Sequence, residues 1–328
     1  MKKTIYLQKG FLQILPILIL LAIAILPLVI LSPSLKNKII NHFKQVPIAA
    51  TQTPTPIVSP TEAPVPIPVK TTNPKPTIIG TPKPVAISLA PVTSNQLPAT
   101  GYESINVVSD VGTFKVDIGA GDVSSTKVVI DTASDSDCSS NCPALPLSTF
   151  IQRRSAYAGI NGTYFCPAES AYASCGANNS FNFLVMNINK YYFNSDMNVY
   201  STNPGAIFSS SYVRFVGAIQ EWGRDTSPDG VISNYPLLVS GGNINFSGSS
   251  DPKLTSKTTR SFVANKGNIV YIGDVFSASA SDVAHVLHTL GVDNALNLDD
   301  AGSAAFWYGG YKVGPGRNIP NAILFINR

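Results

Sequence analysis

The stretch Asn294-Ala295-Leu296-Asn297-Leu298-Asp299-Asp300-Ala301-Gly302-Ser303 decides the fold of this chain. Its apolar residues stop abruptly at two adjacent carboxylates, and small residues follow that allow a tight turn and a close ligand. A buried strand that ends in acids and a glycine turn is a common way to hold a carboxylate at the mouth of a pocket. We therefore expect Asp299 to lie in a functional site.

The N-terminal segment is typical of a membrane-directed chain. Residues 11–31 are almost wholly apolar, a length that suits one membrane crossing as a helix, and three lysines precede them. The segment is either a signal peptide or a signal anchor. Its length, and the lack of a clear small-x-small cleavage site, favour an uncleaved anchor over residues 1–45 that contacts the membrane through residues 11–31.

A proline-rich spacer follows the apolar segment. Residues 46–98 hold 13 of the 25 prolines, with many threonines and no aromatic residue. Such a composition cannot bury enough apolar surface to fold, so we expect an extended, semi-rigid linker over residues 46–100. The folded domain is then expected over residues 101–328.

The charge distribution argues against a nucleic-acid partner. Residues 1–100 have nine lysines and one glutamate, so the remainder has 14 basic and 18 acidic side chains, a net charge of −4. Nucleic-acid binding requires a basic patch on the domain itself. The basic N-terminal region instead suits an anionic bilayer surface.

Four cysteines, Cys138, Cys142, Cys166 and Cys175, indicate an oxidising compartment. Three pairings are possible, and we favour Cys138–Cys142 with Cys166–Cys175, which would close two local loops. The spacings do not fit the usual zinc knuckle, the rival interpretation. The sequence thus predicts a membrane-anchored protein whose domain is extracytoplasmic, at the cell surface.

Short alternating segments predict a domain that is mainly β-sheet. The predicted strands are 105–108, 113–118, 127–130, 157–160, 183–187, 191–193, 206–208, 213–215, 237–239, 261–264, 268–273, 295–298 and 321–326. A short helix is expected over 148–155, and a clear one begins at Ser279 or Ser281 and ends at Gly291. The expected fold class is α+β, a mixed β-sheet domain with few helices, preceded by one transmembrane helix and the Pro/Thr-rich linker.

Four predicted strand ends place polar residues beside glycine or in a short polar run. They are Asn161-Gly162-Thr163-Tyr164-Phe165, Ser240-Gly241-Gly242-Asn243, Thr258-Thr259-Arg260-Ser261 and Asp299 to Ser303. Glycines let a ligand approach the backbone, and free N–H groups hold an oxyanion. An arginine grips phosphate through parallel hydrogen bonds, and a carboxylate serves as acid, base or nucleophile. Together these groups suit an anionic, hydroxyl-rich substrate such as a sugar phosphate ester.

The order of these motifs resembles the phosphodiester glycosidase family over roughly residues 157–326. The family has an Asn-Gly-Gly-aromatic-Phe turn, a Gly-Gly pair before an Arg-Thr/Ser segment, and the motif Ala-Leu-Asn-Leu-Asp-Gly-Gly-Gly-Ser. The matching stretches here are 161–165, 241–242 with 260–261, and 295–303, and the tail matches at Arg317, Pro320 and Asn321-Ala322. Thr163, Asp300 and Ala301 stand where the family has glycine, which would narrow the site.

The resemblance implies an extracytoplasmic hydrolase of sugar-phosphate diester glycosidic bonds or related surface glycans, with a carbohydrate or glycan-phosphate substrate. Asp299 and Arg260 are the expected catalytic residues, and Arg260 would hold the phosphate. Either Asp274 or Asp300 would be the second carboxylate. The expected substrate-binding residues are Asn161, Gly162, Tyr164, Gly241, Gly242, Asn297, Gly302 and Ser303.

Two other functions fit the same residues. The altered glycine run favours a non-catalytic glycan- or cell-wall-binding module on the same fold. Asp299-Asp300 could also form a turn that binds a cation such as calcium. No cofactor and no metal site are expected for the hydrolase, because His285 and His288, three residues apart on the predicted helix, have no carboxylate placed to help them bind a metal.

Overall fold

The structure is a computed structural model of the chain, and it describes residues 92–168, 178–194 and 201–328. These residues all belong to one compact unit, Lys83–Arg328. The predicted anchor and most of the predicted linker lie outside the described residues. Within the described ranges, no helix is long and apolar enough to cross a membrane.

β-strands are the main regular structure of the described chain, which has few helices, and the strands form three sheets. The eight-stranded sheet has the order β1-β2-β3-β14-β13-β15-β11-β12. Its strands are β1 (Val92–Thr93), β2 (Gly101–Ser109), β3 (Gly112–Asp122), β11 (Leu237–Ser240), β12 (Asn243–Ile244), β13 (Thr258–Lys266), β14 (Ile269–Ala278) and β15 (Asn294–Asp300). The short strand β1, in the predicted linker, pairs with β2 in parallel, so the folded domain begins before residue 101.

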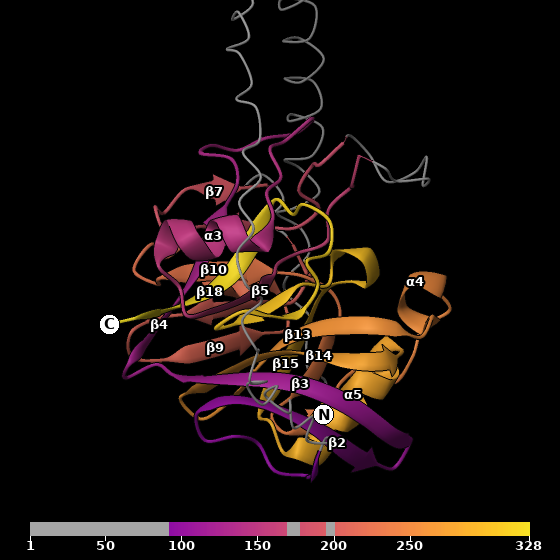
Figure 1. Cartoon of the computed structure of the whole chain (residues 1–328). Coiled ribbons are helices and arrows are strands. Elements are labelled where there is room, and N and C mark those ends of the chain that lie inside the picture. The colour runs from indigo at the N-terminus through magenta and orange to yellow at the C-terminus, as the bar shows by residue number, and fades with distance from the viewer. Residues whose placement is uncertain (1–91, 169–177, 195–200) are drawn as a thin grey trace, which may run out of the picture. The chain divides into compact units, whose positions relative to one another are not determined.

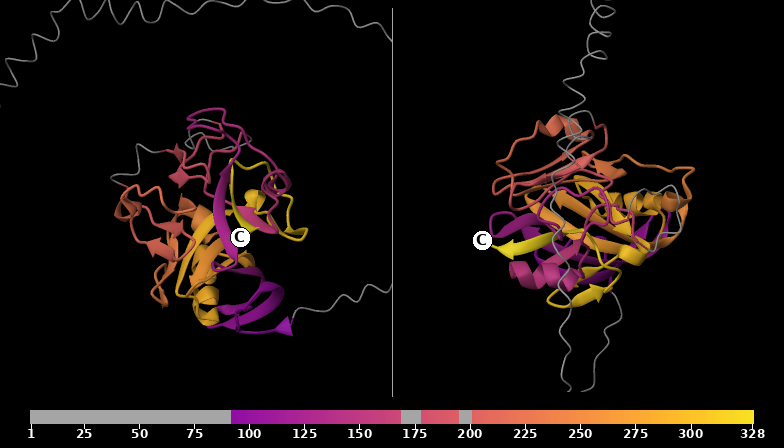
Figure 2. Two further views of the ribbon diagram at one scale, coloured as in Figure 1. Left: turned by 90° about the vertical axis from the view of Figure 1, so that its left-hand side faces the viewer. Right: turned by 90° about the horizontal axis from the view of Figure 1, so that it is seen from above.

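Two five-stranded sheets complete the domain, with the orders β17-β16-β5-β18-β4 and β7-β6-β10-β8-β9. The first contains β4 (Thr126–Thr132), β5 (Ala158–Asn161), β16 (Phe306–Tyr308), β17 (Tyr311–Val313) and β18 (Asn321–Asn327). The second contains β6 (Val185–Met186), β7 (Tyr192–Phe193), β8 (Gly205–Phe208), β9 (Val213–Val216) and β10 (Gly230–Ser233). In both views of Figure 2, the orange-red strands β8 to β10 are grouped on one side of the domain.

The helices are α3 (Leu147–Arg154), α4 (Pro252–Thr255) and α5 (Ala280–Leu290), with 3₁₀ turns η2 (Ile219–Trp222) and η3 (Ala301–Ser303). The expected caps of the long helix are confirmed: the Ser279 side chain accepts the N–H of Asp282, and Gly291 ends α5 with φ 75°. Glycine suits this position because it has no Cβ and therefore adopts positive φ at little cost.

The core is layered. Helix α5 covers one face of the eight-stranded sheet with Val283, Val286 and Leu287, all fully buried. The opposite face packs against the five-stranded sheets, and Val263, Leu296 and Ile323 belong to one buried apolar cluster there. Helix α3 covers the far face of the sheet that contains β18. Figure 1 shows α5 and α3 at opposite ends of this stack.

The disulfide Cys138–Cys142 is present, as expected. Cys175 lies outside the described residues, so the second expected pair, Cys166–Cys175, stays a prediction. Contrary to the expectation that no carboxylate lies beside the histidines of α5, His285 faces Asp110, with Nδ1 2.9 Å from both carboxylate oxygens. Among the described residues, no group of three or more His, Cys, Asp or Glu side chains could hold a metal ion.

Candidate functional site

Asp299 lies at the end of β15, where this strand meets a loop of another sheet. Its backbone N–H donates to the Gly162 carbonyl at 2.9 Å, and the Asn161 side-chain amide donates to the Asp299 carbonyl at 2.6 Å. A Cβ at residue 162 would lie 1.8 Å from Asn321 Oδ1, so only glycine fits there. The Asn161-Gly162 turn therefore fixes the Asp299 backbone rather than facing a ligand.

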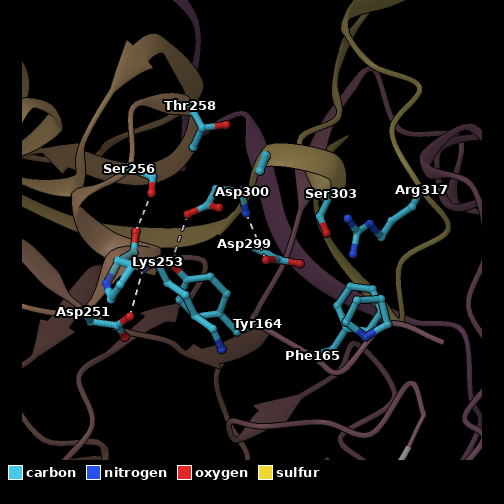
Figure 3. A pocket seen from close by; sticks show the side chains of 13 residues that line it. Tyr164, Phe165, Asp251, Lys253, Ser256, Thr258, Asp299, Asp300, Ser303 and Arg317 are labelled. Carbon is cyan, nitrogen blue, oxygen red and sulfur yellow. Dashed lines mark hydrogen bonds between the residues drawn. The ribbon is translucent and has the colours of Figure 1, made fainter. Parts of the chain in front are cut away.

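A pocket of about 550 Å³ opens beside Asp299. Its walls come from three regions of the chain: the loop after β5, the segment around α4, and the segment from β15 to the turn before β18. The lining residues are Tyr164, Phe165, Pro167, Asp251, Pro252, Lys253, Ser256, Thr258, Asp299, Asp300, Ala301, Ser303 and Arg317. Figure 3 shows Asp299 at the centre, with Ser303 and Arg317 on one side and Tyr164, Lys253 and Asp251 on the other.

Asp299 as a whole residue is only 9% exposed. This burial raises the pKa of Asp299 to about 7, and the neighbouring Asp300 carboxylate adds to the rise, whereas hydrogen bonds from Ser303 and the Asp300 backbone and the charge of Arg317 oppose it. A carboxyl whose pKa lies near neutrality changes protonation state in the pH range where general acids and bases work. Asp299 is thus suited to proton transfer or, when ionised, to nucleophilic attack.

Asp300 faces the buried side chain of Arg260. The Arg260 Nη1 donates to Asp300 Oδ2, and the Tyr164 hydroxyl donates to the same oxygen at 3.1 Å. Burial raises the pKa of Asp300, and the Arg260 charge opposes that rise. Asp300 is therefore the anion that this arginine binds within the protein.

Arg260 itself is 0% exposed and does not line the pocket. Its other nitrogens donate to backbone carbonyls: Nε to Ala278 at 3.1 Å, and Nη2 to Lys253 at 2.6 Å and Ser256 at 2.9 Å. Two of these carbonyls belong to the α4 segment, which forms a wall of the pocket. The structure therefore places Arg260 behind that wall, and not in the pocket where a direct grip on phosphate would require it.

Arg317 is the arginine that faces the pocket. A Cβ at Gly302 would lie 2.2 Å from Arg317 Nη2, so the missing side chain makes room for the guanidinium. Across the described ranges, that guanidinium has no hydrogen bond or salt bridge to another residue. Arg317 and Asp299 both line the pocket, and the charge of Arg317 lowers the pKa of Asp299. Arg317 is thus positioned to bind an anionic ligand group beside Asp299.

Asn297 and Tyr164 form a support beneath the pocket. The fully buried Asn297 donates from Nδ2 to the Tyr164 hydroxyl at 2.7 Å and to the Tyr235 and Leu298 carbonyls. Burial raises the pKa of Tyr164 well above its ordinary value, so the phenol stays neutral and donates to Asp300. Asn297 does not line the pocket, so it affects the pocket only through its hydrogen bond to Tyr164, which does.

The Gly241-Gly242 pair lies away from this pocket, contrary to the expectation that it contributes to the site. Strand β11 runs antiparallel to β15, with Leu237 opposite Leu296 and Val239 opposite Ala295. The glycines after β11 therefore lie beside the beginning of β15, and Gly241 N–H donates to Asn294 Oδ1 at 3.0 Å. With φ of 55° and 77°, the two residues form an exposed turn at the end of the sheet opposite Asp299.

Asp274, one of the two candidate partners of Asp299, is fully buried behind Asn161. Its Oδ1 lies 2.7 Å from Ser261 Oγ, and Ser261 Oγ lies 2.9 Å from Asn161 Oδ1. Burial raises the pKa of Asp274 to about 7. When protonated, Asp274 can donate to Ser261, which leaves the hydroxyl proton for Asn161. Asp274 therefore supports the turn that holds Asp299 and does not reach the pocket.

The sequence reasoning missed the α4 wall and the role of Arg317. Asp251 followed by Pro252 is a signal for a helix start, and the Asp251 side chain does accept the Lys253 N–H at 2.9 Å. Arg317 follows Gly314-Pro315-Gly316, a run that predicts a turn. Neither signal places its residue beside Asp299, because that contact depends on the tertiary fold.

Ala301 occupies a backbone conformation that favours glycine, with φ 53°. This conformation costs a residue with a side chain about 1–2 kcal/mol. The position is one of those where the resembled family has glycine. The substitution therefore leaves the turn in place at a local cost in strain.

Comparisons with known proteins agree with the resemblance. Residues 154–326 match the family described as phosphodiester glycosidase. A solved structure, the zebrafish N-acetylglucosamine-1-phosphodiester alpha-N-acetylglucosaminidase catalytic domain auto-inhibited by pro-peptide, is similar with a TM-score of 0.55 at 16% identity, over 73% of this chain and 87% of that chain. A hypothetical protein from Synechocystis has a TM-score of 0.45 at 15% identity, over 69% and 62%. No curated protein matches the chain.

Proposed function

Because the chain belongs to the phosphodiester glycosidase family, we propose that it is a hydrolase that cleaves the glycosidic bond between a sugar and a phosphate diester. The observation that carries this proposal is that one pocket holds both a buried carboxyl, Asp299, and an arginine, Arg317, whose guanidinium makes no hydrogen bond or salt bridge within the described chain. A sugar 1-phosphodiester presents the matching groups, an anomeric carbon joined to a singly charged phosphate.

In the proposed reaction, Arg317 and Asp299 have separate roles. Arg317 binds the phosphate, and ionised Asp299 acts at the anomeric carbon, as a base toward water or as a nucleophile. The anomeric C–O bond breaks with its electron pair passing to the phosphate oxygen, and the oxygen of water ends on the sugar. Phosphate is a good leaving group, so the site needs no strong general acid.

The remaining expected residues then act as supports. Arg260 positions the α4 wall and neutralises Asp300, while Asn161 and Gly162 hold the Asp299 backbone. Fixing a reacting group in the correct place supplies a large part of an enzyme's rate, so losses here reduce turnover without removing a contact to substrate.

The test is release of free sugar from a panel of sugar 1-phosphodiesters, with Asp299→Asn and Arg317→Ala as variants. We expect kcat/KM of the wild type to rise with pH and level off above about 7, because Asp299 must lose its proton. Asp299→Asn should lose at least 100-fold in kcat, and Arg317→Ala should mainly raise KM. A rate that falls as pH rises through 7 would assign Asp299 the role of acid instead.

The alternative function is a glycan-binding module without catalysis. Asp300 favours this alternative, because its carboxylate accepts the Arg260 hydrogen bond and its side chain narrows the pocket. Binding of a sugar 1-phosphodiester without release of sugar by the wild-type chain would support this alternative. Control reactions with Tyr212→Ala, an exposed residue outside the pocket, establish that substitution as such does not change turnover.

We also propose that the domain is held at a membrane through residues 11–31, on the extracytoplasmic side. The apolar segment, the lysines before it and the Cys138–Cys142 disulfide support this location. Calcium has no support beyond the adjacent carboxylates, because Asp300 is already paired with Arg260.

A further inference from the structure

A second pocket, of about 280 Å³, adjoins the pocket that contains Asp299. The two share four lining residues, Tyr164, Phe165, Asp251 and Lys253. The second pocket is completed by Asn182, Phe183, Tyr235 and Leu254. Because these four residues line both, the two pockets lie side by side.

The second pocket combines ring faces with polar side chains. The ring centroids of Tyr164 and Phe183 lie 6.2 Å apart, and Tyr235 is 43% exposed, with its ring at 83° to that of Phe246. Asn182, Asp251 and Lys253 contribute an amide, a carboxylate and an ammonium. An apolar surface with a few convergent polar groups suits a flat, hydroxylated ring, which packs a C–H face on aromatic carbon and offers its hydroxyls to the rim.

The orientation of the substrate decides which of its parts enters this pocket. In Figure 3, Arg317 lies on one side of Asp299, and Tyr164, Asp251 and Lys253 lie on the other. If the phosphate lies at Arg317 and the anomeric carbon at Asp299, the sugar ring extends away from Arg317. The second pocket then receives whatever is attached to the sugar, and not the alcohol attached to the phosphate.

We propose that the second pocket is a subsite for a further sugar ring on the glycosyl side, so that the preferred substrate is the 1-phosphodiester of a disaccharide or longer glycan. This inference rests on the proposed function, because the orientation of the substrate follows from the placing of its phosphate at Arg317. Tyr235 is the residue that selects for the second ring, because it is exposed and lines only the second pocket.

The experiment compares a hexose 1-(methyl phosphate) with the corresponding disaccharide 1-(methyl phosphate) on the full chain. We expect the wild type to prefer the disaccharide in kcat/KM, and Tyr235→Ala to reduce that preference about tenfold, because the truncation removes the aromatic face on which the second ring packs. Tyr235→Trp should retain the preference. The matched control is Tyr212→Ala, a tyrosine 37% exposed that lines neither pocket, which should leave the ratio unchanged.

Binding to the Asp299→Asn chain separates this inference from the proposed function. If the wild type releases no sugar but Asp299→Asn binds the disaccharide compound more tightly than the hexose compound, and Tyr235→Ala in that background removes the difference, the subsite stands and the hydrolase proposal fails. Equal binding and equal hydrolysis of the two compounds, or a preference that Tyr235→Ala leaves intact, would overturn the subsite.

Discussion

At the scale of single residues, two buried carboxyls set how the domain responds to pH. Asp274 and Asp299 ordinarily titrate at 3.8, and burial raises the pKa of each to about 7 in the folded chain. The folded state therefore binds more protons than the unfolded state between these values. Stability is greatest below about 4, declines as the pH rises through 7, and changes little from this source above that.

Asp274→Asn tests this dependence away from the pocket. Asparagine can donate to Ser261 as the protonated acid does, so the variant should match the wild type at low pH and exceed it by on the order of 2 kcal/mol at pH 8. Denaturant unfolding at several pH values measures the difference. The control is Asp225→Asn: hydrogen bonds from Ser227 lower the pKa of this exposed carboxyl, so its removal should cost stability at neutral pH instead. A constant difference for Asp274→Asn at every pH would contradict the assignment.

Asp299 itself was predictable from the sequence, because an apolar strand that ends in a carboxylate and small residues indicates a pocket edge. The sequence did not predict that Arg317, and not Arg260, would line the pocket. Arg260 has the expected position in the motif, yet Asp300 and three backbone carbonyls occupy its donors. Arg317 lines the pocket, and Gly302, which has no side chain, leaves room for its guanidinium.

At the scale of elements, α4 is the part of the site that depends most on one distant residue. This single turn buries Leu254 and is fastened by the Arg260 donors to Lys253 and Ser256. A helix this short has little stability of its own, so its position follows from those hydrogen bonds.

Arg260→Lys should therefore release α4 while retaining the positive charge beside Asp300. We expect kcat/KM to fall by about tenfold or more, with faster hydrogen exchange in residues 250–257, because a lysine cannot bridge the carboxylate and two carbonyls at once. Arg214→Lys, at an exposed arginine outside the pocket, is the matched control and should change neither quantity. A loss of activity with unchanged exchange would instead favour direct contact between Arg260 and substrate.

The elements show why local patterns predict some features and not others. Helix α5 was identified by its serine cap, its apolar spacing and Gly291, and the hairpin of β13 and β14 by Lys266-Gly267. The same local patterns do not predict which strands pair in the sheet. The expectation that Gly241-Gly242 joins the site failed because β11 pairs antiparallel with β15, and nothing in either strand's own residues specifies that partner or its direction.

At the scale of the whole molecule, the C-terminal strand β18 is an interior strand of its sheet. Strand β18 lies between β5 and β4, and four consecutive apolar residues, Ala322 to Phe325, are fully buried. Asn321 also accepts the Thr163 N–H at 3.0 Å, in the turn that follows Asn161. The last strand therefore holds together two segments that lie early in the domain.

A chain that ends at Pro320 should not fold. Loss of this interior strand removes buried area and ladder hydrogen bonds worth more than the 5–15 kcal/mol by which a typical domain is stable. Circular dichroism melting should show no cooperative transition for this chain, whereas a chain that lacks only the exposed Arg328 should melt within a few degrees of the full chain. A cooperative transition near the full-length Tm would show that β18 is dispensable.

The contact between Gly302 and Arg317 has a consequence for comparing related sequences. The guanidinium occupies the space that a side chain at residue 302 would need, so we expect the two positions to vary together among relatives. A relative that acquires a side chain at the first position must displace or lose the arginine at the second. Reading the two positions together in newly sequenced relatives would therefore separate chains that retain the anion-binding arrangement from those that share only the fold.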